Sequence, residues 1–133
     1  MAQRSTLDWI LRALMIGVGL FDLVAGILVL VAPTFVANVV GLPLPTEEFY
    51  LWLVGLLQVG LASAYLIGGL SPARHIANVI LAAVMRLAMG VVVICIGLNL
   101  DSTIFTLLGV AEIPLGLSHA LYAIRLAPEA ALA

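Results

Sequence analysis

The sequence predicts an all-α fold: an integral membrane bundle of four helices in antiparallel, up-down order. Of its 133 residues, 65% are hydrophobic and 9% are charged, whereas soluble domains average about 45–50% apolar and about 25% charged residues. Four apolar stretches reach the roughly 20 residues that a helix needs to cross a hydrocarbon core. The period-two alternation that a membrane β-barrel requires is absent. We therefore expect one four-helix domain over residues 1–133.

The first two helices are expected at about residues 9–31 and 49–69. Ser5 and Thr6 are candidate N-caps for the first, and Asp8 places an acid in its first turn. The connection between the two helices is too apolar for a solvated loop. Its apolar side chains include Phe35, Val36, Val39 and Val40. This connection is either a short segment in the outer leaflet or a lid packed over the bundle.

The third and fourth helices are expected at about residues 76–98 and 104–126. Ser71 and Pro72 are interpreted as the N-cap and first residue of the third helix. An Asp-Ser-Thr segment precedes the fourth helix and caps it. Pro114 removes one backbone hydrogen bond within the fourth helix and is expected to kink it. The connections on either side of the third helix are short, so consecutive helices are expected to be antiparallel neighbours.

Arginine placement predicts the orientation of the bundle, because cytoplasmic flanks of membrane helices are enriched in basic residues. The arginines that flank helices all fall on one side: Arg4, Arg12, Arg74 and Arg125. The acids of the other side are Glu47, Glu48 and Asp101. We therefore expect both termini in the cytoplasm, in a bacterial inner membrane. The aromatic residues assigned to a belt at the inner boundary are Trp9, Tyr65 and Tyr122.

Composition and spacing exclude several classes of site. A net charge of −2 without a basic run argues against nucleic-acid binding, which needs clustered cations. Cys95 is the one cysteine, and no His, Cys and carboxylate cluster has the spacing of metal ligands, so no metal site is predicted. Nucleophilic triads and Gly-rich phosphate loops are absent. No complete catalytic set remains, which points away from an enzyme.

The expected helices each carry one strongly polar residue well inside the span. These residues are Asp22, Gln58, Arg86 and Glu112. At 1.5 Å per residue they lie roughly 15–20 Å from the cytoplasmic helix ends, near one plane. Small residues share their faces, as at helix–helix contacts in lipid: Gly19, Gly26, Gly55, Gly90, Gly109 and Gly116. The layer therefore faces other helices, and Arg86 is expected to pair with Asp22 or Glu112.

Three roles stay open for this polar layer. It fixes the register of the bundle, forms a ligand, quinone or proton site, or contacts polar groups of a partner. His119 lies seven residues from Glu112 on the same face, flanked by small residues. His119 is a buried structural side chain, a contact to a quinone, lipid headgroup or proton, or a ligand to haem or chlorophyll.

The layout resembles the DoxX-like family of small four-helix membrane proteins. The similar elements are Arg12 and the runs LFDLVAGILVLVAP, LVGLLQVGLASAYLIGGLSPARH and GVAEIPLG. Members of that family typically carry an acid where this chain has Gln58, whereas Glu112 matches the acid of the family's last helix. The resemblance implies association with membrane redox systems, since DoxX itself is the small subunit of a thiosulfate:quinone oxidoreductase.

We therefore expect a small accessory or scaffold subunit of a larger redox or energy-transducing membrane complex. Its partners would be membrane lipid and either other membrane subunits or further copies of the same chain. The first alternative is a quinone- or lipid-binding oxidoreductase component, with Arg86, Glu112 and His119 around the ligand. The second alternative is a subunit that binds haem or chlorophyll through His119.

Overall fold

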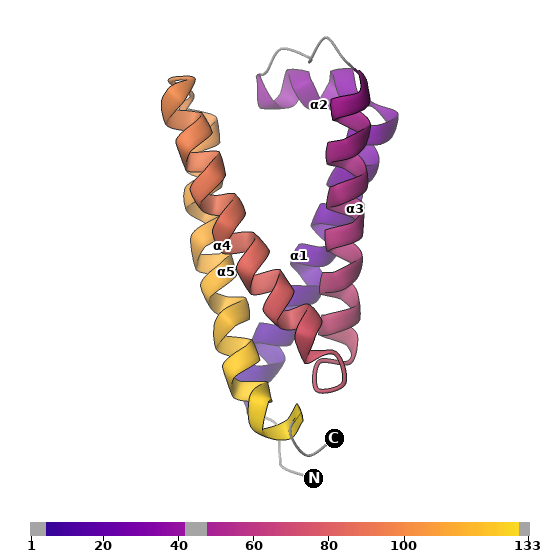
Figure 1. The fold of residues 1–133 in the computed structure, drawn as a ribbon, viewed down its shortest axis with the longest axis vertical. Coiled ribbons are helices and arrows are strands. Elements are labelled where there is room, and N and C mark those ends of the chain that lie inside the picture. The colour runs from indigo at the N-terminus through magenta and orange to yellow at the C-terminus, as the bar shows by residue number, and fades with distance from the viewer. Residues whose placement is uncertain (1–4, 42–47, 131–133) are drawn as a thin grey trace.

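The computed structural model describes residues 5–41 and 48–130, and this part of the chain is helical apart from short turns (Figure 1). Its four long helices are α1 (Thr6–Val31), α3 (Glu48–Leu70), α4 (Ile76–Asn99) and α5 (Thr103–Ala130). All four are long and apolar enough to cross a membrane. The all-α prediction is therefore confirmed, and the four apolar helices indicate an integral membrane protein.

The short helix α2 (Pro33–Val40) was not predicted as a separate element. Pro33 opens it at a position where a missing N–H costs little, and Gly41 ends it with a left-handed φ of 73°. α2 lies at the end of the molecule remote from the termini and projects sideways from α1 and α3 toward the side of α4 and α5 (Figure 1). Phe35 and Val39 on α2 are exposed, so the connection between α1 and α3 presents apolar side chains on its surface. Its placement in a leaflet stays a prediction.

Local signals explain how the helices begin. Ser5 caps α1 as predicted: its Oγ accepts from the Asp8 N–H at 3.3 Å, and the Asp8 carboxylate accepts from the Ser5 N–H at 2.9 Å. The interpretation of Ser71 and Pro72 as the N-cap and first residue of α4 is wrong, whereas the expected start at about residue 76 is confirmed. Because the Ser71 N–H still closes the last turn of α3 on Ile67 O (3.1 Å), α4 begins only at Ile76.

The capping segment of α5 forms as predicted, with the Ser102 Oγ accepting from the Phe105 N–H at 3.5 Å. The segment Thr46-Glu47-Glu48 also predicts a cap at the start of α3, but Thr46 and Glu47 lie outside the described residues. α5 remains one helix through Pro114 and through Pro128, and it ends four residues later than predicted.

The long helices form two antiparallel pairs. α1 packs on α3 and α4 packs on α5, whereas α1 and α5 hardly touch each other. Figure 1 shows that the pairs approach each other at the end that carries both termini and diverge toward the end that carries α2. The bundle is therefore closed at one end only.

The apolar core lies where the two pairs approach. Its buried residues are Leu11, Met15, Tyr65, Val79, Ala82, Tyr122, Ala123 and Leu126. Tyr65 and Tyr122 are 0% and 1% exposed, so their assignment to an interfacial aromatic belt is wrong. Their rings fill the space between the converging helices and therefore do not reach lipid headgroups.

Two arginines link neighbouring helices at the end of the molecule that carries the termini. Arg12 donates to the last carbonyls of α3, at 2.8 Å to Gly69 O and 2.7 Å to Leu70 O, where a helix has no internal donors. Arg125 on α5 pairs with Asp8 on α1 at 2.6 Å. These side chains therefore join helices, in addition to any effect on orientation.

Glycines set the close approach within each pair. In the α4–α5 pair, a Cβ on Gly109 would lie 2.6 Å from the backbone nitrogen of Ile94 and 2.8 Å from the carbonyl oxygen of Gly90. In the α1–α3 pair, a Cβ on Gly26 would lie 3.1 Å from the Gly55 carbonyl oxygen. Gly19 and Gly116 similarly face Tyr65 and Leu87. Close packing in lipid depends on such small residues.

We expect Gly109→Ala to destabilise the protein by about 1–3 kcal/mol, because the added methyl group would meet backbone atoms that cannot turn away. Gly60→Ala is the matched control, since a Cβ there meets nothing within 4 Å. It should leave stability unchanged or raise it by up to about 1 kcal/mol through helix propensity. Unfolding in mixed micelles of increasing SDS content, followed by circular dichroism, measures both. Equal stability of the two variants would contradict this packing.

Candidate functional site

Arg86 on α4 lies between two carboxylates of other helices. Its Nη1 donates to Glu112 Oε2 on α5, and its Nη2 donates to Asp22 Oδ2 on α1. Both Arg86 and Asp22 are buried. Arg86 therefore binds both acids that the sequence offered as alternatives. The bond to Asp22 also links the α4–α5 pair to the α1–α3 pair.

α3 supplies the remaining side chains of this site. Gln58 is half-buried and lies close enough to Asp22 for its side chain to interact with that carboxylate. The guanidinium carbon of Arg86 lies 5.1 Å from the centre of the Tyr65 ring, a cation–π distance. Tyr65 was not predicted as part of the site. The available signal was its position, seven residues after Gln58 and therefore on the same helix face.

A second buried layer lies two helical turns, about 10 Å, from the polar layer toward the terminal end. On each long helix, this layer contains the residue seven positions before or after the polar residue. Each of these four residues is 0% exposed: Met15, Tyr65, Val79 and His119. The rings of Tyr65 and His119 lie 5.6 Å apart. The Tyr65 hydroxyl and both His119 ring nitrogens are buried without hydrogen-bond partners among the described residues.

His119 does not fit a tetrapyrrole ligand. A ligating histidine has to present one ring nitrogen to an open face that accommodates the macrocycle. Every atom of His119 is enclosed, and the Tyr65 ring lies beside it. We therefore do not carry the haem or chlorophyll hypothesis further.

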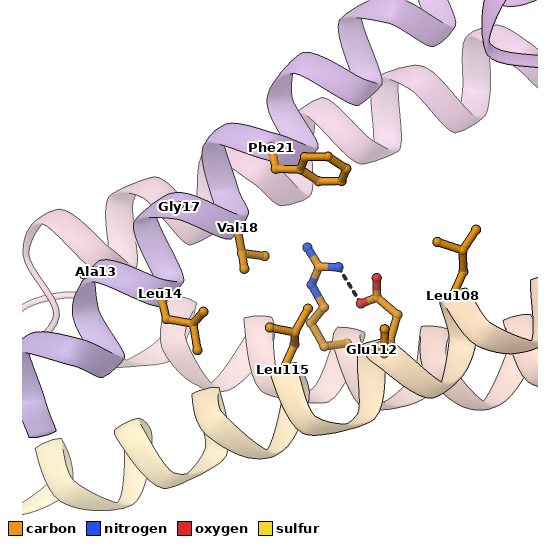
Figure 2. Close-up of a pocket in the computed structure, with 10 residues that line it drawn as sticks. Ala13, Leu14, Gly17, Val18, Phe21, Leu108, Glu112 and Leu115 are labelled. Atoms are coloured by element: carbon orange, nitrogen blue, oxygen red, sulfur yellow. Dashed lines mark hydrogen bonds and ion pairs between the residues drawn. The ribbon is translucent and has the colours of Figure 1, made fainter. Parts of the chain in front are cut away.

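A groove of about 430 Å³ lies between α1 and α5 and reaches the polar layer (Figure 2). Its α1 wall consists of Ala13, Leu14, Gly17, Val18 and Phe21. Its α5 wall consists of Leu108, Ala111, Glu112 and Leu115, with Arg86 also lining it. At 1.5 Å per residue each wall extends about 10–12 Å along its helix. Figure 2 shows Glu112 directed from α5 into the space that faces α1.

The groove exists because its two walls belong to different helix pairs and carry small residues. A Cβ built on Gly17 meets nothing within 4 Å, and Ala13 and Ala111 add little volume. The large wall residues face outward as well: Phe21 is 73% exposed and Leu108 is 48% exposed. The two helices that form the groove are both long and apolar enough to cross a membrane.

The two carboxylates of the site differ in accessibility. The Glu112 side chain is 24% exposed, whereas that of Asp22 is 8% exposed. Glu112 is therefore the acid that a molecule in the groove can reach. Its carboxylate accepts hydrogen bonds and the Arg86 guanidinium donates them, so the groove can hold a polar headgroup in an apolar surrounding.

The chain matches no protein-family model, and no similar curated protein or solved structure was found. The arguments for function therefore depend on the geometry of the polar layer and groove. The resemblance to the DoxX-like family stays a prediction based on sequence pattern.

We expect Arg86→Met to destabilise the protein by about 3–5 kcal/mol, because it leaves two buried carboxylates without their cation. Arg125→Met is the matched control: it removes an ion pair at the surface, where solvent screens the charges, and should cost much less. SDS-induced unfolding measures both.

Combining Arg86→Met with Asp22→Asn and Glu112→Gln should restore part of the lost stability, since no unpaired charge then remains in the interior. A single Arg86→Met variant as stable as the wild type would show that the ion pairs do not hold the helix pairs together.

Proposed function

We propose that the protein is a non-catalytic integral membrane protein that binds an amphiphile in the α1–α5 groove. The apolar chain of the ligand lies along the walls, and its headgroup contacts Arg86 and Glu112. One observation supports this proposal above the others. An apolar groove between two helices long enough to cross a membrane reaches the partly buried ion pair of Arg86 and Glu112.

If the polar layer had only a structural role, we would expect both of its carboxylates to be fully enclosed by protein. Charged groups inside a membrane are costly and normally face the bundle interior, where other protein groups enclose them. Asp22 meets that expectation, but Glu112 remains partly open to the groove. Ligand sites typically combine apolar walls with a few placed polar groups. The accessibility of Glu112 therefore favours binding over register alone.

An isoprenoid quinone, as the family resemblance implies, and a membrane lipid are both ligands of this kind. Quinone carbonyl oxygens would accept hydrogen bonds from Arg86, and the hydroxyl groups of a reduced quinone would donate to Glu112. A bound quinone would supply electron-transfer chemistry, while this chain would orient the headgroup and exclude water. His119, predicted beside the ligand, lies one layer deeper and would act only through Tyr65 and Arg86.

Membership in a larger redox complex remains part of the proposal, with this chain holding the amphiphile for a partner subunit. The glycine faces that carry the polar layer lie at contacts inside the two helix pairs. A partner would therefore contact other surfaces. Both termini lie at one end of the molecule (Figure 1), and we place that arginine-bearing end in the cytoplasm.

The proposal predicts that filling the groove removes a ligand that co-purifies with the protein. We expect Gly17→Leu to abolish binding, because the added side chain enters the space between α1 and α5. Gly60→Leu is the matched control, since it adds the same side chain at an equally open glycine on α3. Protein extracted with surrounding lipid in polymer-bounded discs is analysed by mass spectrometry of its lipids and quinones.

The wild type and Gly60→Leu should carry the same amphiphile, enriched over the bulk membrane, and Gly17→Leu should lack it. Identical lipid and quinone profiles in all three samples would refute binding in the groove.

A further inference from the structure

We propose that the groove selects amphiphiles with a cationic headgroup, specifically long-chain ammonium compounds, which dock on the Glu112 carboxylate. This inference rests on the proposed function, namely that the groove between α1 and α5 binds an amphiphile. It adds the charge of the headgroup, which the shape of the groove does not determine.

The charges of the polar layer do not balance. One guanidinium, Arg86, is bonded to two carboxylates, Asp22 and Glu112, so the set carries a formal charge of −1 when both carboxylates are ionised. The other charged residues on the described parts of α1, α3, α4 and α5 lie near helix ends, and the nearest in sequence, Arg12, is ten positions from Asp22. Ten positions correspond to about 15 Å along the helix. A cation entering the groove would supply the missing charge.

The geometry assigns that cation to Glu112. Arg86 occupies Glu112 Oε2, and no described residue donates to Glu112 Oε1. Asp22 is closed off by burial and by its bond to Arg86. An excess of negative charge is thus presented to the groove by the more exposed of the two carboxylates.

An alkylammonium headgroup suits these surroundings better than a neutral or anionic one. An ammonium group brings a full positive charge and N–H donors for a carboxylate. A hydroxyl group offers one donor and no charge, and a carboxylate or phosphate would add a further negative charge. Phe21 stands on the opposite wall (Figure 2), and an aromatic ring attracts a cation. The remaining walls are apolar and accommodate the alkyl chain.

Three probes that share one alkyl chain test the inference: hexadecylammonium, hexadecanol and hexadecanoate. Binding to purified protein in non-ionic maltoside micelles at neutral pH is measured by native mass spectrometry. We expect hexadecylammonium to bind about tenfold or more tightly than hexadecanol, and hexadecanoate to bind weakest. Attraction between unit charges in contact exceeds the free energy of a tenfold change even at an effective dielectric constant of about 20.

Two charge variants identify the carboxylate responsible. Glu112→Gln should abolish the preference for hexadecylammonium while hexadecanol still binds, because the amide keeps the shape of the side chain. Asp101→Asn is the matched control: it removes one negative charge at an exposed position far from the groove, where φ is 51° and Asn is tolerated. It should bind all three probes as the wild type does.

The outcomes separate this inference from the proposed function. If the three probes bind equally, or hexadecanoate binds best, and Gly17→Leu abolishes that binding, the groove binds amphiphiles but does not select cations. If hexadecylammonium binds Gly17→Leu as well as Gly60→Leu, its site is elsewhere and the inference is wrong. If no probe binds, and the Gly17→Leu protein carries the same native amphiphiles as the wild type, both proposals fail. The comparison of the three probes on the wild-type protein tests the inference even if Glu112→Gln does not fold.

Discussion

The ion pair between Arg86 and Asp22 is the interaction on which the arrangement of this protein depends. Within each helix pair, glycines allow backbones to approach closely, and that packing extends along the helices. Between the pairs, the apolar core occupies only the half of the molecule near the termini. Hydrophobic burial does not drive helices together in lipid. A bond between charged groups in a low dielectric therefore joins the two pairs in addition to this core.

The same arginine connects this structural bond to the groove. Arg86 uses one nitrogen for the enclosed Asp22 and another for Glu112, which is partly open to the space between α1 and α5. A change at Glu112, by a ligand or by a proton, therefore acts on a group that also holds the helix pairs. We therefore expect ligand binding at Glu112 to change the distance between α1 and α5. A ligand shifts an equilibrium between two arrangements only when its contacts differ between them.

Several features of the fold followed from local chemistry in the sequence. The N-cap at Ser5 and the extents of the four apolar helices depend on neighbouring residues and were predicted correctly to within a few positions. The errors concern tertiary context. Ser71 was predicted to start a helix, but its N–H is used by the preceding one. Tyr65 and Tyr122 were assigned to an interface from depth alone, whereas the converging helices enclose their rings.

The sequence by itself determined that this chain forms apolar helices and that Asp22, Gln58, Arg86 and Glu112 lie at one depth, because helical rise and periodicity place residues along and around each helix. Only the tertiary structure decided that Arg86 bridges both acids, that Tyr65 lies against it and that His119 is enclosed below. It also decided that α1 and α5 stand apart, which leaves a groove ending at Glu112. These features depend on distances between helices, which are set by packing between side chains remote in sequence and not by any local pattern.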